Sequence, residues 1–390
     1  MVDEEVDGDV LVVGAGIGGL ALAAGLERAG IPYRVFERAP ALGEIGAGLG
    51  LWANAIRALD TLGVPLGFLD GGASTVQRGE AATASGSVLS AFDVAALSAE
   101  LGARSHVVHR GELHAALAAA VPEARVTLGA ECAGLEPDDD GVTVRFADGS
   151  EARGAIVVGA DGLWSAVRAA AFGDAPPVYA GETCYRAVAA HDAPDPDVLR
   201  EVQGRGLRCC VTSLGPGRVY WWATERRAEG DVVPEAERKA RLTELFAGFA
   251  FGFPEALAAT APDAILQNDL YDRPPLPRWS AGRVTLLGDA AHPSTPNLGQ
   301  GACMAIEDAV VLTRALARHD TPRDAFAAYE AERRDRCYGI VKQSRTLGRV
   351  GSWSNPALVA VREASMRLTP RWLMTRMMRA QIGYDAGPLA

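Results

Sequence analysis

Lysine is nearly missing from this sequence of 390 residues. Only Lys239 and Lys342 occur, and every other basic residue is an arginine. Acidic residues outnumber basic ones by 49 to 38, so the formal net charge is −11. This balance makes nucleic acid and an anionic membrane surface unfavourable partners for the molecule as a whole, although it is compatible with local positive pockets.

Paired cysteines, metal-binding spacings and long apolar runs are missing as well. The six cysteines form no CxxC pair and the six histidines form no HExxH pattern, so we expect buried, reduced thiols and neither a disulfide framework nor a metal site. The first residues, MVDEEVDGD, are acidic where a signal peptide would be basic, and no apolar run reaches the roughly 18 residues of a membrane span. These absences predict a cytoplasmic protein without a membrane span, and the length predicts two or three domains.

The N-terminal stretch DVLVVGAGIGGLALAAGLERAGIPYRVFERA carries a nucleotide-binding signal. Its apolar run, residues 9–13, is typical of a strand that is buried on both faces. The run leads into Gly14, Gly16 and Gly19, which have the spacing G-x-G-x-x-G. The first glycine permits a tight turn, the second lets the backbone approach a pyrophosphate, and the third lets a helix pack on the strand.

The residues after these glycines complete a βαβ unit. We expect a helix over residues 18–29 that stops at Gly30, followed by a strand over residues 33–37. Glu37 ends this strand 23 residues after the first glycine, where an acid can accept hydrogen bonds from an adenosine ribose. The pattern predicts dinucleotide binding but leaves NAD, NADP and FAD open.

Two later stretches repeat the strand-to-loop arrangement. ARGAIVVGADGLWSAVR places Asp161 after an expected strand at residues 155–159, and RVTLLGDAAHP places Gly288 and Asp289 after one at residues 283–287. An acid at the carboxyl end of a parallel strand lies in the crevice where open α/β sheets bind ligands. His292, between the turn residues that follow, is expected to be structural.

These stretches resemble the class A flavoprotein monooxygenases, the family of p-hydroxybenzoate hydroxylase, and are closest in motif to its salicylate hydroxylase and zeaxanthin epoxidase type members. The resemblance rests on the glycine motif with Glu37-Arg38, on GADGLWSAVR, and on the highly specific GDAAHPSTPNLGQGACMAIEDA. It implies an α/β fold: a Rossmann-like FAD-binding domain (1–75, 98–175 and 280–320), an inserted antiparallel-sheet substrate domain (76–97 and 176–279) and C-terminal helices (321–390).

The same resemblance implies roles for single residues. Asp289 would bind the ribitol and pyrophosphate region of FAD, Pro296 would lie beside the reactive C4a edge, and Arg110 in VVHRGELHAAL would approach the dinucleotide. The residues predicted to bind FAD are Gly14, Gly16, Ile17, Gly18, Gly19, Glu37, Arg38, Gly48, Arg110, Asp161, Gly288, Asp289, Pro296, Gly299, Gln300, Gly301 and Ala302.

The stretch GLRCCVTSLGPGRVYWWATER predicts a β-hairpin joined at LGPGR. It resembles the family's sheet that covers the flavin and walls the substrate cavity. Because side chains alternate across a strand, Tyr220 and Trp222 share one face and Trp221 points away. We place Arg208, Tyr220 and Trp222 with Pro296 at the catalytic pocket, where aromatic walls suit a planar substrate and an arginine could hold a carboxylate or phenolate. Packing of these aromatics in the core is the alternative.

The implied function is an FAD-dependent monooxygenase driven by NADH or NADPH. It would insert one oxygen atom from O2 into an electron-rich aromatic substrate (a phenol, an indole or a polycyclic compound) through a flavin C4a-hydroperoxide, in secondary metabolism and as a monomer or homodimer. No second G-x-G-x-x-G has a βαβ context, so the nicotinamide cofactor would bind only transiently. Epoxidation of an alkene, an FAD-linked dehydrogenase or reductase, and a non-enzymatic flavin-binding protein remain open. A halogenase is excluded because the first lysine is Lys239 and YWWATER is not WxWxIP.

Overall fold

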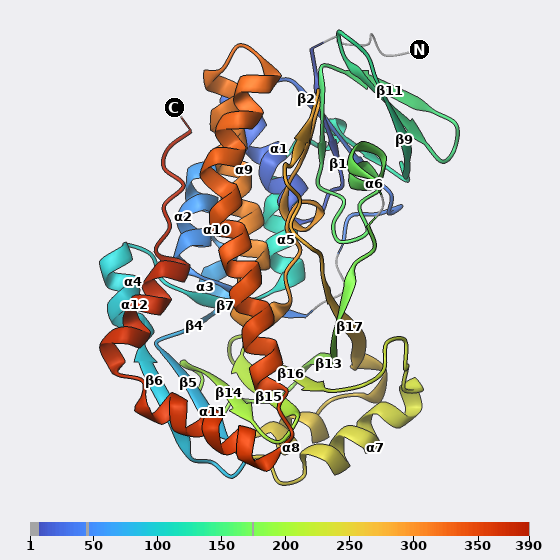
Figure 1. Cartoon of the computed structure of the whole chain (residues 1–390). Helices are drawn as coiled ribbons and strands as arrows, with labels where there is room; N and C mark the ends of the chain where they lie inside the picture. Colours follow the sequence, from blue (N-terminus) through green and yellow to red (C-terminus); the bar gives the residue numbers. More distant parts are fainter. Residues whose placement is uncertain (1–7, 44–46, 174, 390) are drawn as a thin grey trace.

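The computed structural model of the chain describes residues 8–43, 47–173 and 175–389 (Figure 1). One β-sheet lies in the upper part of the view and a second one in the lower part, and the long helix α10 (Pro322–Gly351) runs past both. The predicted α/β architecture with C-terminal helices is therefore confirmed.

The upper sheet has six strands, five of them parallel. In spatial order they are β18 (Ser280–Ala281), β19 (Val284–Leu286), β12 (Ile156–Gly159), β1 (Val10–Val13), β2 (Tyr33–Glu37) and β8 (Val126–Leu128). Strands β1, β12 and β19 are buried along their whole length, as expected for apolar runs covered by helices on both faces. The predicted βαβ unit is confirmed, with its second strand at the predicted bounds.

Helices and two small sheets surround this parallel sheet. The helices are α1 (Ile17–Ala29), α2 (Ala53–Leu62), α3 (Phe68–Gly72), α4 (Val94–Leu101), α5 (Arg110–Ala119), α6 (Ala166–Phe172) and α9 (Gly301–Arg318). The small sheets have the orders β3 (Gly48–Leu51), β7 (His106–His109), β4 (Ser74–Thr75), and β11 (Glu151–Gly154), β10 (Val142–Phe146), β9 (Cys132–Pro137). Helix α1 ends at Gly30 in the left-handed conformation, as the sequence predicts.

The lower sheet has seven strands and is antiparallel except where β14 pairs with β5. Its order is β17 (Leu266–Asp272), β13 (Val178–Ala189), β16 (Val219–Glu225), β15 (Leu207–Ser213), β14 (Val198–Gln203), β5 (Arg78–Thr83) and β6 (Val88–Asp93). Strands β15 and β16 form the predicted hairpin. Helices α7 (Glu235–Phe246) and α8 (Phe253–Ala258) share a buried apolar cluster with one face of this sheet. The domain ranges given above remain our proposed division of the chain.

The C-terminal segment contains one helix more than the sequence suggested. The sequence between Pro356 and Met378 predicts one last helical stretch, but the chain forms α11 (Pro356–Leu368) and α12 (Arg371–Ile382). The break falls at Thr369 and Pro370, because proline disfavours helical backbone in the preceding residue. Short 3-10 turns complete the fold: η1 (Glu123–Arg125), η2 (Pro262–Ala264), η3 (Gly288–Ala290) and η4 (Pro296–Leu298).

Candidate active site

Three loops meet at one edge of the six-stranded sheet. They follow β1, β12 and β19, which are neighbouring parallel strands, so their carboxyl ends lie side by side. The loops fit closely: a methyl group on Gly14 would lie 2.5 Å from the carbonyl oxygen of Ala160, and one on Gly18 would lie 2.7 Å from Leu287 Cδ2. Backbone therefore forms much of this edge, as dinucleotide binding requires.

The glycines of the first loop differ in their surroundings. Gly14 has φ +105°, a conformation that other residues rarely adopt, and a methyl group on Gly19 would lie 1.8 Å from the carbonyl oxygen of Gly14. A methyl group on Gly16 would instead meet no atom within 4 Å. Gly16 precedes the buried Ile17 as the N-cap of α1, and no side chain caps the first N–H groups of that helix. Open space before an uncapped helix N-terminus suits a pyrophosphate.

Glu37 lies at the end of β2, as predicted, with its carboxylate at the first loop. It accepts hydrogen bonds from the backbone N–H groups of Ala15 (2.7 Å) and Ala39 (2.9 Å). These bonds orient the carboxylate and leave lone pairs for the hydroxyl groups of a ribose. The side chain of the next residue, Arg38, is exposed.

Asp161 is held in the second loop by the residues that begin α6. Its carboxylate accepts hydrogen bonds from Ser165 Oγ (2.5 Å) and from the N–H of Val167 (3.1 Å). Burial raises the pKa of Asp161, and these hydrogen bonds counteract the increase. The buried Arg168 donates from Nη1 to the carbonyl oxygens of residues 290 and 291, at 3.0 and 3.2 Å. This arginine ties the second loop to the third.

Gly288 and Asp289 form the third loop, in the turn η3. The N–H of Gly288 donates to Asp308 Oδ2 (3.1 Å), while the exposed Asp289 accepts no hydrogen bond from the described residues. Although the residue is open to solvent on one side, desolvation by the protein atoms around its carboxylate raises the pKa of Asp289, against the attraction of His292 and Arg110. Its carboxylate is therefore an acceptor for which the described residues supply no donor.

The loop before α9 brings Gly299 next to the segment that begins α2, and Pro296 lies exposed in the same loop, in η4. Gly299 has φ +59°, and a methyl group on it would lie 3.2 Å from Trp52 Nε1. The side chain of Gln300 does not cap α9, because its Oε1 accepts a hydrogen bond from Asn54 Nδ2 (2.9 Å). The buried nitrogen atoms Nε1 of Trp52 and Nε2 of Gln300 have no hydrogen-bond partner among the described residues.

The first turn of α9 lies close to the third loop. A methyl group on Gly301, the first residue of the helix, would lie 4.0 Å from Asp289 Oδ1. Ala302 follows it, and no side chain caps this helix N-terminus. An uncapped helix N-terminus is electropositive, so it favours negative charge on a bound group.

Arg110 and Gly48 lie between these loops and the lower sheet. Arg110 begins α5, and its charge acts on both Asp289 and Tyr220. Gly48 begins β3, and a methyl group on it would lie 2.3 Å from carbon atoms of the Tyr220 ring. Strand β3 thus contacts the sheet directly at Tyr220.

The alternation expected for the hairpin decides which side chains face the three loops. Tyr220 packs with the core of the upper part, whereas Trp221 packs with α8, 5.4 Å between its ring centroid and that of Phe253. Trp222 lies on the same face as Tyr220 and is half-buried. Burial raises the pKa of Tyr220, so its hydroxyl is neutral, and it makes no hydrogen bond with the described residues. The face that carries Tyr220 and Trp222 is therefore the one turned toward the loops.

The surroundings of Arg208 differ from our expectation. Its Nη2 donates to both carboxylate oxygens of Glu182, at 2.9 and 3.1 Å, and its Nη1 lies 3.5 Å from Glu201 Oε1. Both members of the Arg208–Glu182 pair are buried, and a methyl group on Gly351 would lie 2.7 Å from Arg208 Cδ. The guanidinium is thus engaged within the protein, and we had expected it to be open to a substrate carboxylate.

A buried charge cluster lies beneath the third loop. His292 Nε2 lies 2.6 Å from Asp308 Oδ2, and Arg333 Nε donates to Asp308 Oδ1 (2.7 Å). The ring of His292 also lies against Trp279, with 5.0 Å between centroids. His292, Asp308 and Cys337 have ligand atoms within 4.8 Å of one another, but protein donors already occupy both oxygens of Asp308. The geometry therefore supports the structural role that we expected for His292.

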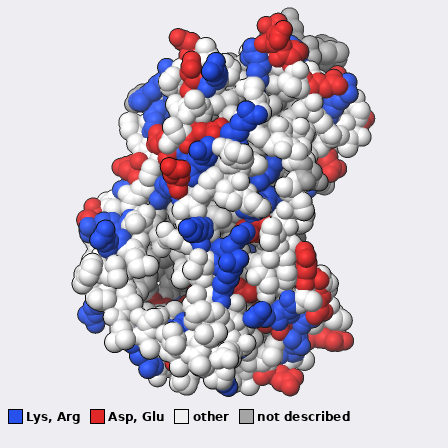
Figure 2. All heavy atoms as spheres, in the orientation of Figure 1, with Lys and Arg blue, Asp and Glu red and all other residues white. Residues whose placement is uncertain are grey.

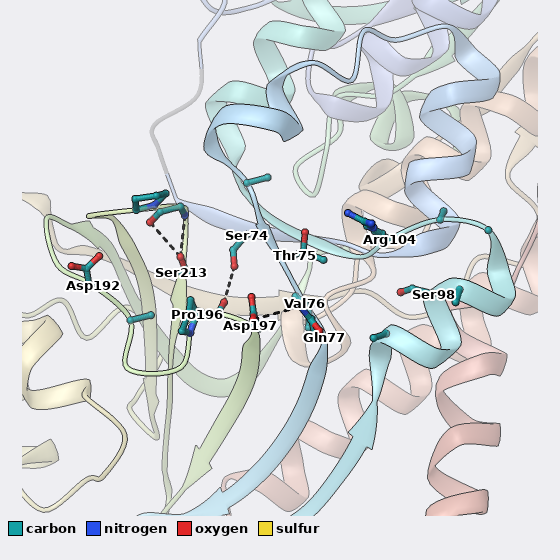
Figure 3. Close-up of a pocket in the computed structure, with 18 residues that line it drawn as sticks. Ser74, Thr75, Val76, Gln77, Ser98, Arg104, Asp192, Pro196, Asp197 and Ser213 are labelled. Atoms are coloured by element: carbon teal, nitrogen blue, oxygen red, sulfur yellow. Dashed lines mark hydrogen bonds between the residues drawn. The ribbon is translucent and has the colours of Figure 1, made fainter.

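A cleft of about 1100 Å³ lies elsewhere. Figure 3 shows its walls: Ser74 and Gln77 beside residues 196–197, and Arg104 on the far side. Ser74 Oγ donates to the carbonyl oxygen of Pro196 at 2.7 Å. None of the predicted site residues lines this cleft, so its volume does not identify the active site.

Some residues of the site could not be found from the sequence. Glu182 neutralises Arg208, Asn54 connects α2 to Gln300, and Asn297 Nδ2 donates to the carbonyl oxygen of Ser344 (3.0 Å) in α10. Each contact joins segments that are far apart in the chain. No local spacing or periodicity signals such a pairing.

Comparison with known proteins gives consistent results. The sequence profile described as FAD binding domain matches residues 7–344. The chain is 41% identical over 360 residues to the aurachin C monooxygenase/isomerase of Stigmatella aurantiaca, covering 92% of this chain and 94% of that one. It is 35% identical over 378 residues to the 2-heptyl-3-hydroxy-4(1H)-quinolone synthase of Pseudomonas aeruginosa, covering 93% and 94%.

A solved structure shares the whole fold. It is HpxO of Klebsiella pneumoniae complexed with FAD and uric acid, with a TM-score of 0.90, 30% sequence identity and 99% coverage of both chains. The parallel sheet with its three glycine-rich loops and the antiparallel sheet facing them define a flavoprotein of the monooxygenase type. The chain belongs to the class A FAD-dependent monooxygenases.

The residues present fit FAD. The space before Gly16, the carboxylate of Asp289 without a donor, and the uncapped N-termini of α1 and α9 lie around the three loops. They offer acceptors for hydroxyl groups and N–H groups for phosphate and ring oxygens.

Proposed function

We propose that this chain is a hydroxylase that uses NADH or NADPH and O2 to place one oxygen atom on an electron-rich aromatic or heteroaromatic ring. The observation that carries the proposal is the position of Tyr220 and Trp222 on the sheet face turned toward the cofactor loops, with the Tyr220 hydroxyl neutral and without a partner among the described residues. A planar ring suits such a wall, and a polar group on the ring suits the hydroxyl. The names of the relatives, which include a hydroxyquinolone synthase, support a substrate of this class.

We assign the cofactor to the loops that follow β1, β12 and β19. Gly16 and the N-terminus of α1 would hold the pyrophosphate, Glu37 the adenosine ribose, and Asp289 the ribitol region. Arg110 and Asp161 would lie beside the dinucleotide, and Pro296 with residues 299–302 beside the ring system. When bound, FAD supplies the redox chemistry, by which a nicotinamide cofactor is oxidised, one atom of O2 enters the substrate and the other leaves as water.

The protein's own contribution is orientation and exclusion of water. Tyr220 would donate a hydrogen bond to an oxygen or nitrogen of the substrate, and Trp222 would stack along the ring. Arg208, engaged with Glu182, would act as a positioning residue for this face, since its Cζ lies 6.0 Å from the Trp222 ring centroid. The backbone of α10 closes over the pair at Gly351 and excludes water from it.

The test is the oxidation of NADH and of NADPH by the purified, FAD-loaded protein in aerated buffer. The panel would contain phenols, indoles, hydroxyquinolines and quinolones, and the products would be weighed after reaction under ¹⁸O2. We expect one class to accelerate nicotinamide oxidation and to gain a single labelled oxygen atom. Tyr220→Phe should raise KM for that compound, and Tyr179→Phe, a tyrosine near the far end of β13, serves as the matched control.

Two outcomes would replace the proposal. Turnover with an artificial electron acceptor but no labelled product would establish a dehydrogenase or reductase. Label that enters an alkene but no aromatic ring would establish an epoxidase.

A further inference from the structure

The C-terminal helices expose an unusual amount of apolar surface. Of the twelve large apolar side chains that are exposed among the described residues, five lie within residues 358–377. They are Leu358 (44% exposed), Val361 (60%), Leu368 (79%), Trp372 (65%) and Met377 (51%). Single exposed apolar side chains are common on soluble proteins, but five of them within two consecutive helices point to an interaction surface. We call these five residues the apolar face.

Helix α11 is oriented with its apolar side outward. Val361 and Leu368 lie two turns apart on its exposed side, whereas Arg362 is buried. Arg362 donates from Nη1 to the carbonyl oxygen of Gly351 (2.8 Å) and from Nη2 to that of Gly204 (2.9 Å). These bonds fix the rotation of the helix. A surface helix normally buries its apolar side, whereas α11 buries Val359 together with Arg362 and exposes Leu358, Val361 and Leu368.

The charges within residues 358–377 are mostly basic, and Glu363 is the one acidic residue there. Residues 364–384 contain no aspartate or glutamate but contain four arginines. Arg379 is paired with Glu100 (2.5 Å), while Arg367, Arg371 and Arg376 are exposed and have no acidic partner among the described residues. Figure 2 shows a broad uncharged surface at the lower left, where α11 and α12 lie in Figure 1, with basic side chains at its margin. This local positive charge stands out in a chain with a net charge of −11.

We propose that the apolar face and these three arginines bind the surface of an anionic lipid bilayer. Interfacial helices combine Trp, Leu and other apolar residues on one side with arginines that reach lipid phosphates. The exposed Trp372 suits the headgroup region, where tryptophan is enriched. Helices α11 and α12 have 13 and 12 residues, and no helix among the described residues is long and apolar enough to cross a bilayer. The contact is therefore peripheral.

A second copy of the chain fits this surface less well. A twofold interface places the same patch on both partners, so it would bring the unpaired arginines of both copies into one interface. An anionic bilayer instead complements them. Both helices contact β6, the edge strand of the sheet that carries Tyr220 and Trp222, so the bilayer would lie beside the substrate sheet. The proposal does not depend on the reaction proposed above.

The experiment is flotation of the FAD-loaded full chain with vesicles of phosphatidylcholine alone and of phosphatidylcholine mixed with phosphatidylglycerol. We expect binding only to the mixed vesicles, with weakening as salt is raised. In the triple variant R367Q/R371Q/R376Q the partition coefficient into the mixed vesicles should fall about a hundredfold, which corresponds to about fivefold for each arginine. The matched control is R226Q/R278Q/R323Q, which removes three exposed arginines elsewhere. The control should bind like the wild type.

A second pair of variants tests insertion. In L368S/W372S the partition coefficient into the mixed vesicles should fall about tenfold for each side chain. In V232S, at an exposed valine before α7, it should not change. FAD absorbance and circular dichroism verify that each variant is folded. Equal behaviour of L368S/W372S and wild type would overturn the proposal, because binding would then be electrostatic only. A dimer in sedimentation velocity that L368S/W372S abolishes, without vesicle binding by the wild type, would assign the face to a protein partner instead.

Discussion

Arg208 on β15 and Glu182 on β13 form a buried ion pair across the sheet, although β16 lies between their strands. Nη2 of the arginine lies 2.9 and 3.1 Å from the two carboxylate oxygens. Burial works against the charge on Arg208, but Glu201 and Glu182 outweigh it and raise the pKa of the guanidinium, which stays charged. The pair explains how this face can carry an arginine without exposing it to substrate.

Glu182→Gln should destabilise the fold, because it leaves the buried guanidinium with only the more distant Glu201. Removal of one partner of a buried pair costs about 3–5 kcal/mol, so the free energy of unfolding should fall by about that amount. Urea unfolding of the FAD-loaded protein measures it. Glu136→Gln, in the exposed pair with Arg145, should change it very little. An equally small effect of Glu182→Gln would show that the pair does not contribute to stability.

Two neighbouring tryptophans should respond in opposite ways. Trp221 is fully buried on the side of α8, and its Nε1 donates to Thr260 Oγ1 (2.8 Å). Trp221→Ala should therefore cost about 3–5 kcal/mol of stability. Trp222→Ala, on the loop-facing side, should instead raise KM for the aromatic substrate with a smaller effect on unfolding. Thermal unfolding and steady-state kinetics of the two variants distinguish these effects, and loss of stability in both would place Trp222 in the core.

Asp289→Ala should weaken FAD binding by about tenfold or more. The carboxylate accepts no hydrogen bond from the described residues, and hydrogen bonds to a charged group contribute about 1.5–3 kcal/mol. Titration of the FAD-free protein with FAD, followed by flavin fluorescence, gives the Kd. Asp263→Ala, at an exposed acid in η2, serves as control. Unchanged affinity in Asp289→Ala would remove this residue from the proposed FAD site.

The sequence predicts those parts of the fold that depend on neighbours in the chain. The run before Gly14 and the strand ending at Glu37 are signalled by local apolar patterns and turn glycines, and the structure has both. The hairpin around residues 214–218 is signalled in the same way. The break between α11 and α12 does have a local signal, because Pro370 disfavours helical backbone at Thr369.

The site depends on contacts that no local pattern encodes. The alternation placed Tyr220 and Trp222 on one face, but only the contact between Tyr220 and Gly48 shows which way that face is turned. Likewise, no residue near Arg208 in the sequence indicates that its partner is Glu182, which lies 26 residues earlier. Buried charges are paired by tertiary packing, and no local pattern in a single sequence shows which distant residues will pack together.

The buried pair of His292 and Asp308 should make the free energy of unfolding depend on pH. The directions of the two pKa shifts determine the sign of that dependence. Burial opposes the charge on His292, but Cys337 and Asp308 outweigh it and raise its pKa well above the usual value. Burial likewise opposes the charge on Asp308, but His292 and Arg333 lower its pKa to about 2. In the unfolded chain the two groups titrate near about 6.5 and 3.9.

The stabilisation from His292 is therefore complete below about pH 6.5 and is lost as pH rises toward its folded pKa, while that from Asp308 is lost as pH falls from about 4 toward 2. The difference in unfolding free energy between wild type and His292→Gln should be largest at mildly acidic pH and should shrink as pH rises above about 6.5. Urea unfolding of both proteins across that range measures it. His319→Gln, at an exposed histidine after α9, should keep the wild-type slope. A difference that grows with pH would mean that His292 is neutral in the folded protein, and that its bond to Asp308 is an ordinary hydrogen bond.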